Sequence, residues 1–231
     1  MSSVILNIES STTNCSVALG KAGQCIDLLE INDGYSHAEK LAPFVNDMLQ
    51  KHNHSVSDLD AIAVSMGPGS YTGLRIGVSL AKGLCYSANK PLISVSTLQL
   101  MCLHPNVQKQ LTGKDSLLCP MLDARRMEVY SAVYDKDLNP VEEIRAKILD
   151  ESSFEDLLEQ GPILFFGTGS DKFKPVVNSP NATFVENIWP SAREMCSIAQ
   201  SKLKINAMED VAYFEPYYLK DFMATTPKKL L

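Results

Sequence analysis

The sequence predicts an α/β protein made of two halves with a similar order of elements. Three observations predict this class. Each half opens with short apolar segments separated by polar turns, as in an antiparallel β-meander. Apolar residues at three- and four-residue spacing then indicate amphipathic helices between further strands. A length of 231 residues is enough for two domains of about 100 residues each.

The first half is expected to form three strands and then alternating helices and strands. One helix is marked by an apolar face that includes Leu41, Val45 and Met48, and another follows the glycine-rich segment 67–73 and ends before Pro91. The expected elements are strands 4–8, 15–19 and 25–31, a helix from about 37 to 49, strand 61–66, a helix from about 71 to 89, and strand 92–95.

The second half follows the same order loosely. A polar run at 105–114 separates the halves and is predicted to be a hinge. The expected elements are strands 117–122, 129–134 and 143–148, helix 152–159, strand 163–166 and helix 191–204. No residue-level repeat accompanies this order, so it is only a weak indication of duplication.

Composition excludes several classes of protein. Lys and Arg total 21 against 27 Asp and Glu, a net charge of −6, whereas a protein that grips nucleic acid by itself usually has a basic surplus. No apolar run approaches the roughly 18 residues of a membrane helix. The first residues do not resemble a secretory signal. The six cysteines have no metal-ligand spacing and are expected to be reduced core residues of a cytoplasmic protein.

The strongest local motif is the segment 65–77, which reads as a strand, a glycine loop and a helix start. Exposed backbone N–H groups and the helix dipole can form an anion site at such a place. The segment is not a Walker A motif, because no Gly-Lys-Ser/Thr closes it. The alternative is a tight turn in which Ser70 or Thr72 caps the helix.

A stripe of small residues runs along the helix after this loop. Gly73, Gly77 and Ala81 recur at four-residue spacing. Glycine destabilises a helix interior by roughly 1 kcal/mol, which implies a compensating contact. Small residues allow close approach either by a helix of a partner or by other parts of the same chain, and the sequence leaves both readings open.

Two further segments are candidates for nucleotide contact. The polar turn 9–14 resembles the phosphate-binding hairpin of actin-like and sugar-kinase-like ATPases, and its candidate residues are Glu9, Ser11 and Thr12. A second glycine loop supplies Gly167 and Gly169. Both are equally compatible with ordinary turns. No catalytic residue and no metal site is predicted, because neither HExxH nor GxSxG occurs and the histidines lack ligand spacing.

Six segments match, in order, the pattern of one known family. The string Gly-Pro-Gly-Ser-x-Thr-Gly-Leu-Arg-x-Gly is the most specific of them. The matching segments are 5–12, 37–43, 65–77, 123–125 with 128–130, 167–169 and 215–219. On these residues the chain resembles the TsaB (YeaZ) family, the dimerisation subunit of the bacterial tRNA threonylcarbamoyladenosine machinery.

This resemblance implies a fold of two actin-like domains of the ASKHA, ribonuclease H-like class. The first would span 1–104 and the second 105–207, and residues 208–231 would return to pack on the first domain. The helices that begin near His37 and Tyr71 are implied to bind a partner. The implied interface residues are Leu41, Phe44, Val45, Met48, Leu74, Arg75, Val78 and Ala81.

The resemblance also implies a role as a non-catalytic scaffold. Such a subunit binds the catalytic subunit TsaD, together with the ATPase TsaE, for threonylcarbamoyl transfer to the adenosine following the anticodon of tRNAs that read codons starting with A. It implies no cofactor of its own, ATP or ADP only at a shared interface, and a homodimer when the chain is alone. It implies tRNA contact only through the complex, with Lys228 and Lys229 at most accessory, and a cytoplasmic location away from membranes.

Two positions depart from the family pattern. Glu9 stands where Asp is usual, and Met127 stands where many members have Gly. A bulky residue in a phosphate turn argues against close approach of nucleotide to the backbone, so ATP turnover by this chain alone is not expected. Two alternatives are a small-molecule kinase or ATPase of the actin-like superfold and a peptidase, although no peptidase constellation is visible.

Overall fold

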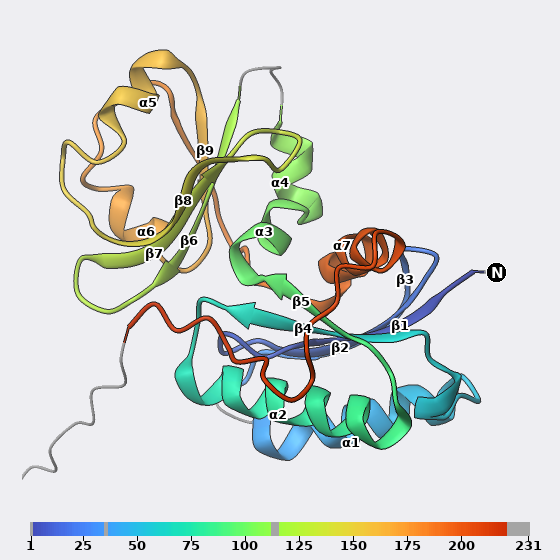
Figure 1. Ribbon diagram of the computed structural model, residues 1–231. Helices are drawn as coiled ribbons and strands as arrows, with labels where there is room; N and C mark the ends of the chain where they lie inside the picture. The colour runs from blue at the N-terminus through green and yellow to red at the C-terminus, as the bar shows by residue number, and fades with distance from the viewer. Residues whose placement is uncertain (1, 35–36, 112–115, 221–231) are drawn as a thin grey trace, which may run out of the picture.

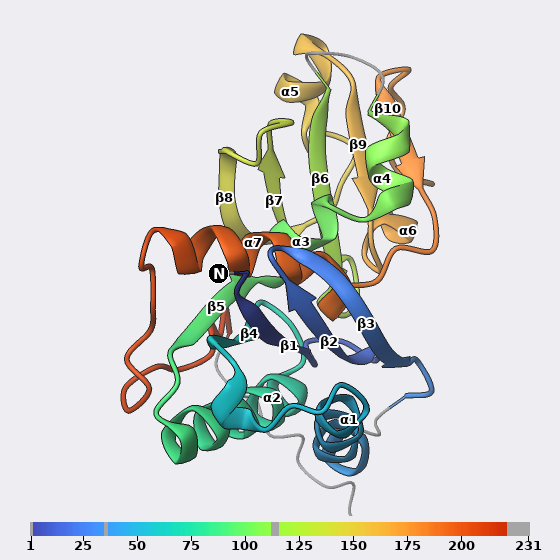
Figure 2. The ribbon, with the colours of Figure 1, turned by 90° about the vertical axis from the view of Figure 1, so that its right-hand side faces the viewer.

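The computed structural model describes residues 2–34, 37–111 and 116–220 and consists of two β-sheets flanked by helices (Figures 1 and 2). The strand order is β3-β2-β1-β4-β5 in the first sheet and, read from the opposite edge, β8-β7-β6-β9-β10 in the second. In both sheets three antiparallel strands are followed by two strands parallel to the central one. The α/β class is confirmed, and the two halves share one topology.

The first sheet follows from the short turns near the N-terminus. β1 (Val4–Glu9), β2 (Cys15–Lys21) and β3 (Gln24–Ile31) are joined by turns that only antiparallel neighbours allow. β4 (Ala61–Gly67) and β5 (Leu92–Ser96) each follow a helix and run parallel to β1. Five of the six residues of β1 are buried, because helices cover both faces of this sheet.

Three helices cover the first sheet. α1 (His37–Lys51) and α2 (Tyr71–Ala88) lie on one face, and α7 (Ala192–Lys204) lies on the other (Figure 1). The short 3₁₀ helix η1 (Val56–Asp58) connects α1 to β4. Apolar side chains of α1 and α2 pack with those of β1, β2 and β4 into one core. Helical spacing therefore predicted α1 correctly, and the glycine segment 67–73 together with Pro91 predicted α2.

The second sheet carries helices on both faces as well (Figure 1). Its strands are β6 (Leu117–Asp123), β7 (Glu128–Tyr134), β8 (Pro140–Ile148), β9 (Ile163–Phe166) and β10 (Ala182–Val185). Its helices are α5 (Glu155–Gln160) and α6 (Ser170–Phe173) on one face and α3 (Thr97–Cys102) and α4 (Pro105–Gln110) on the other. The predicted hinge thus begins with a helix, and residues 112–115 lie outside the described ranges.

Two helices connect the halves. The helix predicted at 191–204 was assigned to the second domain, but α7 packs against β1, β2, β3 and β5 of the first sheet. The helix α3 follows the first sheet in sequence and contacts β6 and β7 of the second sheet as well as β4 and β5 of the first. Side chains of both helices, such as Met101 and Met195, join residues of both sheets in one core. The sequence could not predict this packing of α7, because helical spacing shows an apolar face but not which sheet that face contacts.

The segment after α7 returns to the first domain. The Glu209 backbone N donates to Leu92 O at 2.9 Å and so covers the free edge of β5. Further on, Tyr217 N donates to Met66 O at 2.7 Å. Lys82 of α2 donates from Nζ to Phe214 O at 2.9 Å. The predicted return is confirmed for 208–220, whereas Lys228 and Lys229 lie outside the described residues.

The cysteines agree with the prediction that they are reduced and mostly buried. All six cysteines are free thiols, and five of them are buried. Burial raises the pKa of Cys85 and of Cys15 to about 12, which keeps both thiols protonated and unreactive. Within the described ranges, no helix is both long and apolar enough to cross a lipid bilayer.

The glycines of α2 divide into two kinds. A Cβ added at Gly77 would lie 2.1 Å from Ser10 Oγ, so glycine is required where the helix touches the end of β1. A Cβ added at Gly83 would meet nothing within 4 Å. Of the two readings of the small-residue stripe, packing within the chain is therefore correct for Gly77. Gly83 lies outside that stripe, and no contact with the described residues explains a glycine there.

Substitution at these two glycines should have opposite effects on stability. Gly77→Ala should lower the free energy of unfolding by about 1–3 kcal/mol through overpacking. Gly83→Ala should raise it by about 1 kcal/mol, because alanine is the better helix former and its methyl group has open space. Urea unfolding followed by circular dichroism measures both. Equal effects of the two substitutions would contradict this account of α2.

Candidate functional site

The turn between β1 and β2 holds the first predicted nucleotide residues, and its hydrogen bonds point inward. The Glu9 side chain is fully buried, and its Oε1 accepts from Ser11 N at 2.6 Å. Ser10 N donates to Ser65 Oγ at 3.4 Å, and Asn14 N donates to Thr12 Oγ1 at 3.2 Å. These three backbone donors are therefore already used within the chain.

The burial of Glu9 also changes its acidity. Loss of hydration raises the pKa of this carboxyl to about 7, although hydrogen bonds from Ser11, Ser65 and Ser10 oppose the rise. One carboxyl oxygen, Oε2, has no hydrogen-bond partner among the described residues. A buried carboxyl of this kind differs from the exposed carboxylate that would hold hydrated Mg²⁺.

The glycine loop of the strongest motif lies directly on this turn. Ser70 N donates to Ser11 O at 2.6 Å, and Ser10 Oγ donates to Gly73 O at 2.9 Å. A Cβ added at Gly69 would lie 2.3 Å from Ser11 O, so only glycine allows this approach. Ser70 Oγ accepts from Gly73 N at 3.3 Å and caps α2. The reading of this loop as a tight turn with a serine cap is therefore correct.

The second predicted glycine loop is likewise packed against its own sheet. Gly167 has a φ of +97°, and a Cβ there would lie 2.4 Å from Met121 O. Gly169 meets Val129 in the same way at 2.7 Å. Thr168 between them accepts from Asp123 N at 3.1 Å. Gly167 and Gly169 thus allow the loop to pack against β6 and β7, while Glu9, Ser11 and Thr12 belong to the other sheet.

Six of the eight predicted interface residues are buried in the core of the chain. Only Phe44, which is half-buried, and Arg75, which is exposed, reach the surface. The buried six are Leu41, Val45, Met48, Leu74, Val78 and Ala81, each at most 4% exposed. These six side chains pack inward in the free chain, because the apolar spacing that marked them is the signal of the face that packs on the sheet.

The outward face of α2 lies opposite this apolar face. Five exposed residues of this helix recur at three- and four-residue spacing, namely Thr72, Arg75, Ser79, Gly83 and Tyr86. We call these five residues the outer stripe. The Tyr86 side chain is 86% exposed, which is unusual for a large aromatic residue. The outer stripe occupies the positions of the helix that the predicted apolar face does not.

An aromatic cluster lies at the N-terminal end of the outer stripe. Arg75 Nη1 donates to the Tyr71 hydroxyl at 3.1 Å, and its guanidinium lies 5.5 Å from the centre of the Tyr71 ring. The ring of Tyr218, from the returning C-terminal segment, lies 4.8 Å from that of Tyr71. Tyrosine and arginine are enriched in protein–protein interfaces, so this cluster suits a binding surface. Sequence spacing could not find it, because Tyr218 is distant in sequence.

Comparisons with known proteins agree with this architecture. Residues 34–228 match the family model described as TsaD: tRNA N6-adenosine threonylcarbamoyltransferase. The tRNA threonylcarbamoyladenosine biosynthesis protein TsaB of Escherichia coli is 32% identical over 226 residues, which cover 95% of this chain and 96% of that protein. The TsaB protein of Bacillus subtilis is 31% identical over 75% of this chain and 74% of its own length.

A solved structure shares the whole fold. YeaZ from Pseudomonas aeruginosa superimposes with a TM-score of 0.81 over 94% of this chain and 100% of that chain, at 24% identity. The fold and the family model together define an actin-like protein related to the TsaD transferases. Within that class, identity to TsaB proteins over nearly the full length shows that the chain belongs to the TsaB (YeaZ) family.

The buried Glu9 carboxyl should make stability depend on pH. Between its ordinary pKa of 4.5 and its folded pKa of about 7, only the unfolded chain loses the proton, so stability falls as pH rises. Glu194, whose pKa burial also raises to about 7, adds to this slope. Glu9→Gln should reduce the fall across this window by up to roughly 3 kcal/mol, measured by urea unfolding at both ends.

The matched control is Glu159→Gln, because Glu159 is exposed on α5. It should leave the slope of wild-type stability against pH unchanged. A Glu9→Gln variant with the wild-type slope would show that this carboxyl is not held protonated in the folded chain.

Proposed function

We propose that this chain serves tRNA threonylcarbamoyladenosine biosynthesis as a non-catalytic scaffold that binds and organises TsaD together with the ATPase TsaE. Membership of the TsaB family supports the pathway. The use of the donors of the β1–β2 turn within the chain supports a non-catalytic role, because these groups are the ones that would otherwise bind phosphate.

The observation that carries the binding role is Gly83 in the outer stripe. Glycine inside a helix destabilises it by roughly 1 kcal/mol relative to alanine. Gly69 and Gly77 are explained by contacts within the chain, but the space around Gly83 is open. A partner helix that approaches α2 closely explains a glycine there, since small residues permit short distances between helix axes. Ser79, one turn earlier, is also small and exposed.

The relation between the chain and TsaD suggests how the two pair. A family model of the transferase matches most of this chain, so the two proteins have a common architecture. Related chains can pair through equivalent faces in the manner of a twofold homodimer. We propose that α1 and α2 pack on the corresponding helices of TsaD, with Phe44 and the outer stripe at the contact. When TsaD is absent, a second copy of the chain occupies the same face.

The remaining parts of the proposal concern nucleotide and RNA. ATP or ADP binds at an interface shared with the partners and not within the β1–β2 turn. The chain has a net charge of −6, which supports tRNA contact through the complex. Its site of action is the cytoplasm.

Gly83→Leu tests the contact with TsaD. Leucine favours the helix and has open space, so the variant should fold normally. Its side chain should keep the partner helix at a distance and weaken copurification of TsaD by more than about tenfold. Restoration of threonylcarbamoyladenosine in tRNA of a strain that lacks the native gene should fail in parallel.

The matched control is Ser197→Leu. Ser197 is exposed on α7, on the opposite face of the first sheet. This control should retain both binding and tRNA modification. Normal TsaD binding by a folded Gly83→Leu variant would overturn the proposed contact, and loss of binding by both variants would place the contact elsewhere.

A further inference from the structure

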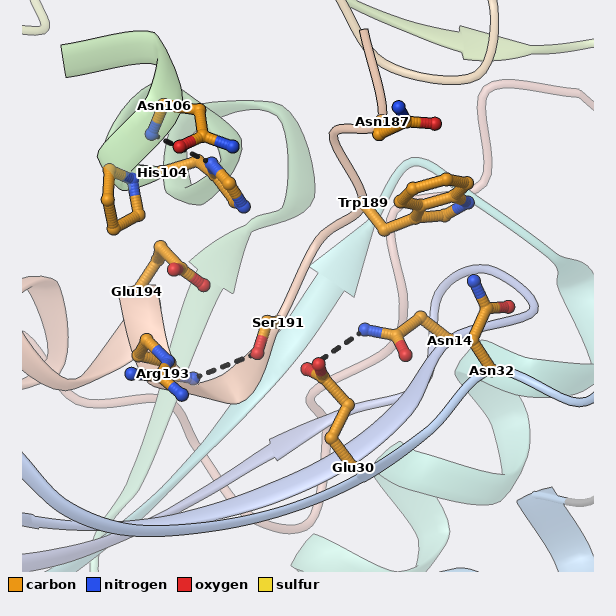
Figure 3. Close-up of a pocket in the computed structure, with 11 residues that line it drawn as sticks. Asn14, Glu30, Asn32, His104, Asn106, Asn187, Trp189, Ser191, Arg193 and Glu194 are labelled. Carbon is orange, nitrogen blue, oxygen red and sulfur yellow. Dashed lines mark hydrogen bonds between the residues drawn. The ribbon is translucent and has the colours of Figure 1, made fainter. Parts of the chain in front are cut away.

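A polar cleft lies where the two halves meet, on the side of the β3 edge (Figure 3). It has a volume of about 390 Å³, within the range of small-molecule sites. Four separate segments line it: the end of the β1–β2 turn, the end of β3, the start of α4, and the segment that leads into α7 together with the first turn of α7. None of the residues in the glycine loops or the outer stripe contributes to this cleft.

Glu194, in the first turn of α7, is the buried acid of this cleft. Its side chain is 7% exposed, and its Oε2 has no hydrogen-bond partner among the described residues. Figure 3 shows the carboxyl group pointing into the space below His104. A buried polar group without a hydrogen-bond partner destabilises the folded state, so a hydrogen-bond donor to this oxygen is missing in the free chain. Burial raises the pKa of Glu194 to about 7, and a cationic partner would favour its ionised form.

The other residues that line the cleft indicate which chemical groups a cationic ligand would need. Glu30 adds a second carboxylate, held by a hydrogen bond from Asn14 Nδ2 at 3.1 Å. His104 Nδ1 accepts from Asn106 N at 3.2 Å, which places the proton of the neutral ring on Nε2 as a donor to a ligand. Trp189 presents a flat aromatic surface on the opposite wall (Figure 3).

We propose that this cleft binds a small primary amine that also carries a hydrogen-bond acceptor. The ammonium group pairs with Glu194, the acceptor meets His104, and the body of the ligand stacks on Trp189. An ammonium ion supplies three donors in a compact volume and matches an unpaired carboxylate oxygen. Arg193 lies at the exposed rim, where it can contact an anionic substituent of the ligand. This site is independent of the proposed contact with TsaD.

Intrinsic fluorescence offers a direct test, because Trp189 is the only tryptophan of the sequence. Tyramine and glucosamine serve as probes, with N-acetyltyramine and glucose as their neutral counterparts. Titration of the full chain up to about 10 mM of each compound should change the Trp189 emission for an amine but not for its counterpart. Glu194→Gln, which keeps the shape of the side chain, should weaken binding more than about tenfold.

Two further variants complete the test. Glu186→Gln is the matched control, because Glu186 pairs with Lys174 on the surface and does not line the cleft. It should bind like the wild type. If Glu194→Gln fails to fold, Trp189→Ala with detection by calorimetry takes its place and should also weaken binding. No response to either amine, equal binding of the neutral counterparts, or unchanged binding by Glu194→Gln would each overturn the proposal.

Discussion

The structure depends on one close contact between backbones, that of the glycine loop with the turn after β1. Ser70 N and Ser11 O are 2.6 Å apart, and no side chain larger than hydrogen fits at Gly69 or Gly77. This contact fixes the start of α2 on the end of β1. It thereby uses the polar atoms of the turn within the chain, buries the apolar face of α2, and directs the outer stripe toward solvent. In this chain, the turn that the sequence marked as a candidate nucleotide contact anchors a helix that we propose binds a protein partner.

A second constraint is the placement of α3 and α7 between the halves. The helix α7 follows the second sheet in sequence and packs on the first, and α3 contacts strands of both sheets, so the two sheets share a core that includes Met101, Phe166 and Met195. The polar cleft with Glu194 lies at the edge of this shared core. The relative position of the halves therefore sets the shape of the cleft, because its walls come from both.

Local patterns in the sequence were sufficient for most of the fold. Turn residues marked β1 to β3, helical spacing marked α1, and the glycine segment 67–73 and Pro91 marked the two ends of α2. Short elements such as α3, α6 and β10 escaped prediction, because four to six residues carry too little periodicity. Six of the predicted interface residues lie in the core for a physical reason: spacing identifies the apolar face, which packs inward, whereas Gly83 and Tyr86 have no apolar pattern. The cleft escaped because Glu30, His104 and Glu194 meet only in three dimensions.

The late position of α7 in the chain also determines when the first sheet can be completed during synthesis on the ribosome. Chain synthesis completes β1 to β5 within the first 96 residues, but the helix that covers one face of that sheet ends at Lys204. The strand edge of β5 stays open until Glu209 has been made. One apolar face of the first sheet therefore stays uncovered until most of the remaining chain has been synthesised. In this protein, the first sheet to be synthesised is among the last parts to be finished.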